Sequence, residues 1–276
     1  EQHPGAFAGA MSACGVTGDW DSEVGSLVDL RAVYNFYTRG TKYELPGNHD
    51  ITANGVSPTP PTGLGFARTP WLFWQLKRMS GVMADLFKAA RANPSGPEAR
   101  MVARIASVAK ADADPASFIF PIMTAMVSME DMRASFGGVV YGNVGKVYDS
   151  PLLTPGEKAE LDAGIQRVAS DAPARAFAVQ WHQSTGRFTT PLVAVHNRHD
   201  GLVFAEQALL LKQRVQVAGN QAHLFQLWAP SLQKDIPGTG LKGWAHCGFN
   251  PRQAAVLWKT LHDWVESGRK PAMGVY

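Results

Sequence analysis

The chain has 276 residues, of which 45% are hydrophobic and 18% charged, and its formal net charge is +3. This apolar content is sufficient for a packed core, and the low charged fraction argues against extensive disorder. The basic residues are scattered without forming a run, so we expect no nucleic-acid partner. No apolar stretch is long enough for a membrane span, and none is expected.

Residues 1–5 resemble the end of a helix entering a turn, without a signal peptide, so we expect the chain to begin inside a fold. Nothing in the sequence indicates localisation. Residues 7–15 are small and apolar, which is typical of a buried strand in a crowded parallel sheet. The turn residues at 15–18 end this predicted strand.

From about residue 21 to residue 187 the sequence changes to apolar-patterned stretches separated by proline and glycine. Proline stands at or near the start of several of them, where its missing N–H does no harm. The segment Thr154-Pro155-Gly156-Glu157 has the pattern of a capping box. Residues 45–65 and 137–153 are turn-rich. We predict helices at residues 21–37, 70–92, 97–110, 115–136, 154–170 and 173–182.

The last part of the chain alternates strands and helices. We predict strands at residues 191–196 and 222–228, and helices at 204–218 and 251–267. This alternation favours a parallel sheet with crossover connections. The fold class is therefore α/β, with a parallel sheet interrupted by a long helical insertion. We expect three parts, at residues 1–20, 21–188 and 189–276.

Two loops of this last part carry the candidate catalytic residues. Asp200 follows one predicted strand, and His246 follows the next. An acid and a histidine in this order supply two members of a Ser-Asp-His triad in α/β-hydrolases. Asp200 could instead cap the helix near residue 203, and His246 could be a loop histidine bonded to the backbone. Asp19, which follows the first strand, is the rival acid.

Other reactive residues have simpler interpretations. Ser12 follows small strand residues as an elbow serine would, but Cys14 stands where the elbow needs glycine, and no helix follows at once. We therefore interpret Ser12 as a buried strand serine. The segment 48–50 (Asn-His-Asp) is interpreted as turn chemistry. Strand or loop roles, rather than catalysis, are expected for His196, His199 and His223.

The two cysteines, Cys14 and Cys247, are too few for a disulfide framework or a usual zinc site. Both are expected at the carboxyl ends of strands near the candidate site. They could form one bridge or be small buried residues, and the sequence leaves this open. Cys247 is a poor nucleophile candidate because it is the immediate neighbour of His246.

Methionines are concentrated in the helical insertion. An adaptable apolar wall for an acyl or aromatic substrate is one interpretation, and ordinary helix packing is the other. The same two interpretations apply to Trp71, Phe73 and Trp74. The methionines concerned are Met79, Met83, Met101, Met123, Met126, Met129 and Met132.

Four segments resemble lidded α/β-hydrolases when taken together. Residues 3–16 (HPGAFAGAMSACGV) are similar to the approach to their sixth strand, and 141–148 (YGNVGKVY) to a turn in their lids. Residues 191–203 (PLVAVHNRHDGLV) resemble their acid loop, and 243–251 (GWAHCGFNP) their histidine loop. The resemblance implies a partial α/β-hydrolase sheet with a large helical lid, in which Asp200 is the acid and His246 the base.

The family also has a G-x-S-x-G elbow before the sixth strand, and this sequence has none there. The resemblance therefore implies that the serine lies on an N-terminal part of the same protein or on a complementing chain. It implies hydrolysis of carboxylic esters or amides through an acyl-enzyme, with no metal or organic cofactor, and an inactive isolated chain. Alternatives are an acyltransferase of the same fold and a non-catalytic binding protein derived from it; esterase and peptidase activities are not separated.

Overall fold

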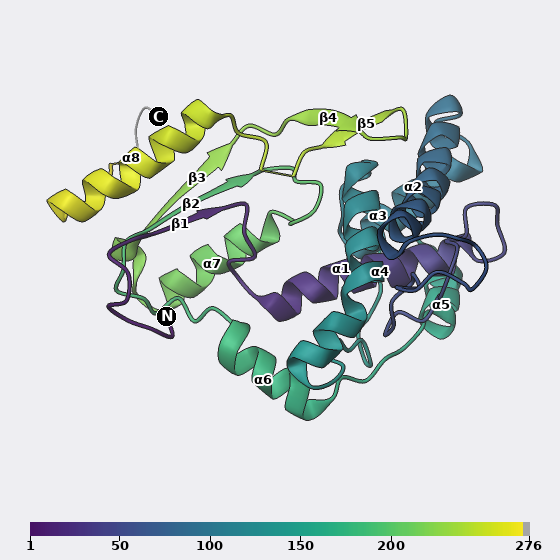
Figure 1. The fold of residues 1–276 in the computed structure, drawn as a ribbon, viewed down its shortest axis with the longest axis horizontal. Coiled ribbons are helices and arrows are strands. Elements are labelled where there is room, and N and C mark those ends of the chain that lie inside the picture. The colour runs from purple at the N-terminus through teal and green to yellow at the C-terminus, as the bar shows by residue number, and fades with distance from the viewer. Residues whose placement is uncertain (273–276) are drawn as a thin grey trace. The chain divides into compact units, whose positions relative to one another are not determined.

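The computed structural model describes residues 1–272, and its architecture is mixed α/β. Figure 1 shows the arrangement of the elements. In chain order they are β1 (Ala10–Ala13), α1 (Trp20–Thr38), α2 (Arg68–Ala92), α3 (Pro97–Ala109), α4 (Ala116–Phe136), α5 (Pro155–Gly164), α6 (Ala172–His182), β2 (Leu192–Asn197), α7 (Glu206–Val217), the short 3₁₀ helix η1 (Gln221–His223), β3 (Leu224–Ala229), β4 (Gln233–Ile236), β5 (Leu241–Trp244) and α8 (Pro251–Ser267).

The chain divides into two compact units. The first, here called the sheet unit, contains Glu1–Glu23, Ala178–Leu232 and the residues from Ala245 onward. The second, the helical unit, contains Val24–Phe177 and Gln233–Trp244. These divisions fall at residues 23/24 and 177/178, whereas the expected boundaries were at 20/21 and 188/189. In addition, Gln233–Trp244 belongs to the helical unit.

The sheet unit is built on three parallel strands in the order β1-β2-β3. In the register, Ala13 of β1 is opposite Val195 of β2, and Val195 is opposite Leu227 of β3. The ladder continues past the end of β1, where the N–H of Cys14 donates to the carbonyl of Val195 at 2.8 Å. All three strands therefore end at the same edge, where the loops that follow them meet.

Helices cover both faces of this sheet (Figure 1). Successive side chains of a strand point to opposite faces. Val193 and Val195 pack with α8 through Leu257, Leu261 and Trp264. Ala194, between them in sequence, packs with Leu211 and Val215 of α7 on the other face. Full burial of a branched aliphatic side chain stabilises a fold by about 1.5–3 kcal/mol, so these two layers fix the sheet.

The expectation that β1 is a buried strand was wrong. Ala10 and Ala13 are exposed, and Met11 retains 41% of its side-chain surface. Within residues 1–272, β2 is the only strand that pairs with β1, so the outer edge of β1 has no strand beside it. Its small apolar side chains therefore remain accessible, although their composition suits burial.

The helical unit has an apolar interior rich in methionine. Met79 and Met83 of α2 and Met126 and Met129 of α4 are each exposed by 1% or less. This burial fits ordinary packing better than an open apolar wall. Trp71 is also buried and stacks on Trp74 with ring centroids 5.0 Å apart, whereas the side chain of Phe73 is 66% exposed.

A buried arginine organises the long loop that follows α1. Arg31 has no exposed surface, and its guanidinium donates to the carbonyls of Asn48, Asp50 and Ala53 at 2.8–2.9 Å. Within the loop, Asn48 Oδ1 accepts from the N–H of Asp50, and the ring of His49 bonds to the carbonyl of Leu45. These are turn contacts, as expected for Asn48-His49-Asp50.

The helix predicted over residues 154–170 is shorter than expected. α5 begins with the predicted capping box, in which Thr154 Oγ1 accepts from the N–H of Glu157 at 3.3 Å. α5 ends at Gly164, because the residues that follow it bond to the loop that contains Asn143 instead of continuing the helix. Asn143 Oδ1 accepts from the N–H of Val168 at 2.7 Å, and the N–H of Asn143 donates back to the carbonyl of Val168.

The hairpin β4–β5 was not predicted. Its strands are antiparallel, with Gln233 opposite Trp244 and Ile236 opposite Leu241. The turn between them, residues 237–240, has Gly238 and Gly240 at φ +74° and +72°. The backbones on either side of the hairpin bond to each other, because the N–H of Ala245 donates to the carbonyl of Leu232 at 2.8 Å. This bond brings the chain back to the sheet unit one residue before His246.

Candidate active site

Asp200 lies in the loop that follows β2, and its side chain is fully buried. Its Oδ1 accepts from the N–H groups of Leu202 and Val203 at 2.9 and 3.0 Å, and its Oδ2 from the N–H of Cys247 at 3.4 Å. The bonds to residues 202 and 203 form a tight turn that fixes the carboxylate. They do not cap a helix, since α7 begins later, at Glu206.

His246 faces this carboxylate. Its Nδ1 lies 2.8 Å from Asp200 Oδ1, and its side chain is 35% exposed. A carboxylate only accepts, so Nδ1 carries the proton when the ring is neutral, and Nε2 presents a lone pair. Among residues 1–272, no group hydrogen-bonds to Nε2 of His246. The structure thus brings together the two predicted site residues and leaves one ring nitrogen open to a reacting proton.

A buried acid near this pair was not foreseen from the sequence. Glu23 in the first turn of α1 is only 3% exposed. Burial, and then the negative charges of Asp200 and Glu206, raise the pKa of Glu23 to about 8. Glu23 is therefore mostly protonated near neutral pH and adds little negative charge beside Asp200. The sequence carries no signal for this, because acids are common in the first turn of any helix.

The rival acid, Asp19, is occupied by other partners. Its carboxylate pairs with Arg214 and accepts from the N–H of Asp21 at 2.9 Å. Its own N–H donates to Gln207 Oε1 at 3.0 Å. Within the described residues, neither Asp19 oxygen bonds to a histidine. Asp19 ties the start of α1 to α7.

Ser12 and Cys14 do not complete a triad in residues 1–272. Ser12 is half-buried rather than buried, because the outer edge of β1 has no strand beside it within residues 1–272. It pairs with Ala194 in the ladder, and its hydroxyl does not bond to His246. Cys14 stands at the strand end with φ +46°, a conformation that suits an exposed nucleophile. However, it is 2% exposed, and burial raises the pKa of its thiol well above the ordinary value. A protonated, buried thiol is a weak nucleophile.

The other three histidines named from the sequence lie in strands, loops or a 3₁₀ helix and not at the acid–histidine pair. His196 of β2 is 2% exposed, bonds through Nδ1 to the carbonyl of Asn197, and meets Trp228 edge-on. The N–H of His199 donates to Ser231 Oγ at 2.8 Å. His223 lies in η1. None of the three bonds to Asp200 in the described part of the chain.

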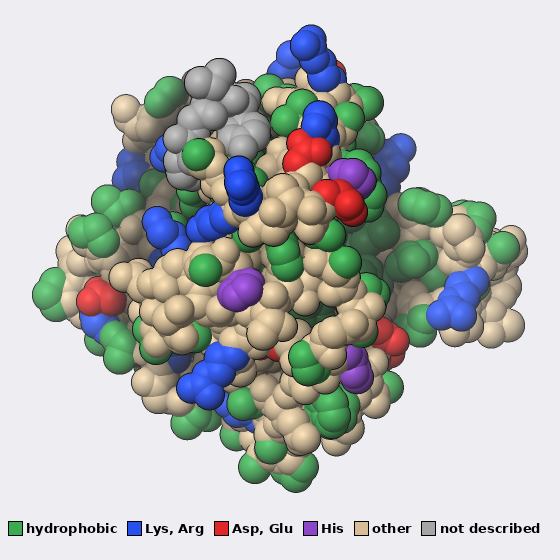
Figure 2. Space-filling model, turned by 90° about the vertical axis from the view of Figure 1, so that its left-hand side faces the viewer, with side chains coloured by type: hydrophobic (Ala, Val, Ile, Leu, Met, Phe, Trp, Pro, Cys, Tyr) green, Lys and Arg blue, Asp and Glu red, His purple; other side chains and the backbone are tan. Residues whose placement is uncertain are grey.

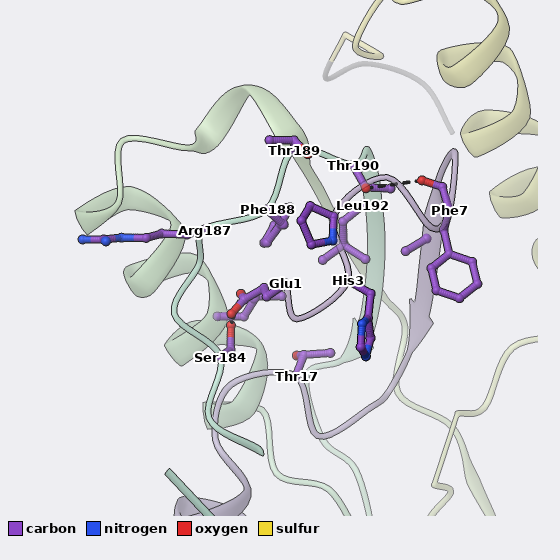
Figure 3. Close-up of a pocket in the computed structure, with 13 residues that line it drawn as sticks. Glu1, His3, Phe7, Thr17, Ser184, Arg187, Phe188, Thr189, Thr190 and Leu192 are labelled. Atoms are coloured by element: carbon purple, nitrogen blue, oxygen red, sulfur yellow. Dashed lines mark hydrogen bonds between the residues drawn. The ribbon is translucent and has the colours of Figure 1, made fainter. Parts of the chain in front are cut away.

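A cavity of about 440 Å³ lies elsewhere in the sheet unit (Figure 3). Phe7, Phe188 and Leu192 contribute apolar walls. Figure 3 shows Glu1 beside Ser184, and the Glu1 carboxylate also accepts from the N–H groups of residues 185 and 186 at 2.7 and 2.9 Å. Neither Asp200 nor His246 lines this cavity, so it is not the site of the acid–histidine pair.

Three further features of the described residues concern their charged surface, possible metal ligands and possible membrane-spanning helices. On the face shown in Figure 2, Lys and Arg side chains lie at several separate places among apolar and polar ones. Residues 1–272 contain no group of three or more His, Cys, Asp or Glu that could hold a metal ion. Over the same residues, no helix has the length and apolar character required to cross a membrane.

Comparison with models of protein families, with curated proteins and with solved structures gave no match for this chain. Any functional assignment therefore rests on the acid–histidine geometry and on the short segments that resemble lidded α/β-hydrolases. Fold class alone does not define function, because one fold supports many chemistries.

Proposed function

We propose that this chain supplies the acid and the histidine of a serine hydrolase with an α/β-hydrolase fold, and that the helical unit is its lid. The observation that carries the proposal is the bond of 2.8 Å between His246 Nδ1 and the buried Asp200 Oδ1. It leaves Nε2 of an accessible imidazole without a partner in residues 1–272. A buried acid, a histidine and an open ring nitrogen are what a catalytic base requires.

The two residues would act in sequence on a carboxylic ester or amide. A serine hydroxyl attacks the carbonyl carbon while His246 Nε2 takes its proton, and Asp200 stabilises the resulting imidazolium. His246 then protonates the leaving alcohol or amine, which departs and leaves the acyl-enzyme. Water attacks the acyl carbon, with His246 again acting as base, and the acid product and serine are released.

We place the serine outside residues 1–272, on an N-terminal part of the protein or on a complementing chain. Two observations support this placement. No hydroxyl within residues 1–272 bonds to His246 Nε2. In addition, the outer edge of β1 carries small apolar residues without a strand beside it, as suits a neighbouring strand that would precede β1 in the complete sheet.

Labelling with a serine-reactive phosphonate tests the proposal. The chain of residues 1–276 alone should form no adduct, and the gene product extended upstream should form one at a serine in a G-x-S-x-G segment. His246→Gln in the extended protein should abolish labelling, because Nε2 no longer takes the proton. Exposed His262 of α8 provides the matched control, and His262→Gln should label normally. An adduct at Ser12, or labelling that survives His246→Gln, contradicts the proposal.

A further inference from the structure

The two cysteines of the chain lie against each other next to His246. Cys14 directly follows β1, and Cys247 directly follows His246. Each thiol shifts the pKa of the other, as two thiols close together do. Cys14 Sγ donates to Asn197 Oδ1 at 3.8 Å. Cys247 Sγ also donates to the carbonyl of Ala13, the residue before Cys14, at 3.1 Å. Two thiols far apart in the sequence thus lie close together, and backbone hydrogen bonds hold both residues at the same edge of the sheet.

The backbone at both positions is unusual. Within residues 1–272, three residues other than glycine have a positive φ: Cys14 at +46°, Lys110 at +56° and Cys247 at +41°. Lys110 ends a helix, where this conformation is common. The other two are the touching cysteines. Left-handed backbone at such residues persists where the surrounding structure holds it, and such positions concentrate at functional sites.

We propose that Cys14 and Cys247 are an oxidation site, at which a disulfide joins the end of β1 to the loop that carries His246. The proposal does not depend on the hydrolase assignment. It follows from the contact between the thiols, their shared left-handed backbone and the fixed chain on both sides. Neither cysteine is in a disulfide in the structure, and each sulfur makes only a weak hydrogen bond, to Asn197 Oδ1 or to the carbonyl of Ala13.

The bridge would form by exchange with a small-molecule disulfide such as oxidised glutathione. Cys247 is the more accessible thiol, so its thiolate attacks first, forming a mixed disulfide and releasing one glutathione thiolate. The Cys14 thiolate then attacks the sulfur of Cys247 and expels the second glutathione. The two protein thiol protons end on the two glutathione molecules, and the protein has lost two electrons.

The surroundings of the thiols favour a bridge that resists reduction. Burial is the main cause that raises the pKa of both thiols, and the negative charge of Asp200 raises both further. Strongly oxidising disulfides are those whose reduced thiolate is stabilised, and here the thiolates are disfavoured. The same feature makes formation slow near neutral pH, so oxidation should be fastest in mildly alkaline buffer or during folding.

The bridge has a direct consequence for His246. In the reduced chain, Cys247 is held by one weak sulfur hydrogen bond to Ala13, next to β1, and by the bond from its N–H to Asp200. A covalent link would hold this loop against β1 and restrict the unfolded chain across most of its length. Oxidation should therefore raise the melting temperature and hold His246 more firmly beside Asp200.

The test equilibrates the purified chain with oxidised and reduced glutathione in mildly alkaline buffer, both folded and during refolding. Free thiols are then alkylated under denaturing conditions and the protein is mapped by mass spectrometry without reduction. We expect a peptide containing Cys14 linked to one containing Cys247, a protein lighter by two hydrogen atoms, and a melting temperature above that of the reduced chain. Cys14→Ser and Cys247→Ser should each abolish the linked peptide and the redox dependence of melting.

Two results would overturn the proposal. One is full alkylation of both cysteines after equilibration and after oxidative refolding. The other is separate glutathione adducts, or links only between molecules, without the internal bridge. If a serine variant fails to fold, the peptide map of the unsubstituted chain still decides between these outcomes.

Discussion

The two most informative buried carboxylates of this protein have different surroundings. Asp29 in the helical unit accepts from the hydroxyls of Tyr141 and Tyr148 at 2.7 and 2.6 Å, and its other oxygen pairs with Lys146. Asp200 in the sheet unit accepts from backbone N–H groups and from His246. Both oxygens of Asp29 are bonded to side chains of the helical unit. The hydrogen bond from His246 to Asp200 instead leaves the other ring nitrogen of an accessible imidazole without a partner in residues 1–272. Burial and hydrogen bonding of an acid therefore do not by themselves mark a catalytic site, and the role that we propose for Asp200 rests on the open end of its network.

The largest expected effect is a difference in kcat between variants of Asp200 and of Asp29. If the proposed hydrolase function holds, Asp200→Asn in the complete protein should lower kcat for an ester by about 10⁴-fold, because an amide favours the wrong tautomer of His246. Asp29→Asn should leave kcat within about threefold of the original, provided that the protein is folded. Steady-state kinetics on a chromogenic ester measures both. A loss of less than about tenfold for Asp200→Asn would contradict the assigned role.

The second expected effect is a loss of folding stability when Asp29 is replaced. Asp29→Ala removes the acceptor of two buried phenol hydroxyls and should lower the free energy of unfolding by about 3 kcal/mol. Burial, and then the charge of Asp29, raise the pKa of Tyr148 to about 12, so this phenol stays protonated and needs an acceptor. Urea unfolding measures the loss, with exposed Asp263→Ala on α8 as control. Equal stability of the two variants would show that the Asp29 network is not structural.

Glu23 should make stability fall as the pH rises. Its pKa is raised from 4.5 to about 8 in the folded state, so the folded chain binds more protons than the unfolded chain between these values. The stabilisation is complete below the unfolded pKa and is lost as the pH passes the folded pKa. The loss should be a few kcal/mol. Glu23→Gln should remove this dependence, and exposed Glu266→Gln should retain it, in urea unfolding at about pH 5 and about pH 9. A pH dependence unchanged in Glu23→Gln would contradict the assignment.

The smallest effects concern two capping boxes, one in each unit. Asn250 Oδ1 accepts from the N–H of Gln253 at 3.0 Å at the start of α8, and Thr154 does the same for α5. Replacing either residue by alanine should cost about 1 kcal/mol of stability. Only Asn250→Ala should also raise the KM or lower the kcat of the proposed ester hydrolysis, because α8 begins directly after the His246 loop. Equal activities would confine both caps to a structural role.

Part of this structure could be predicted from local patterns. Proline at helix starts and the Thr154 capping box located the starts of helices to within a few residues, because these signals are local. The contact between Asp200 and His246 followed from topology, since loops after parallel strands meet at one edge. The α/β class and the helical insertion followed from the same alternation of elements.

The remaining features depend on contacts between distant residues. The hairpin β4–β5 was not predicted, because the residues of its first strand are mostly polar and exposed and lack an apolar strand pattern. The small apolar residues of β1 predict a buried strand, but composition alone does not show which strands lie beside it. Glu23 resembles any acid in a first helical turn, and its raised pKa comes from packing. The Cys14–Cys247 contact likewise requires the fold.

The rate of ester hydrolysis by the complete protein, measured for His246→Gln beside His262→Gln, tests the central claim most directly. We predict that hydrolysis falls to the background rate when His246 is replaced and is unchanged when exposed His262 is replaced. Hydrolysis that persists in a folded His246→Gln protein would show that this histidine is not the catalytic base.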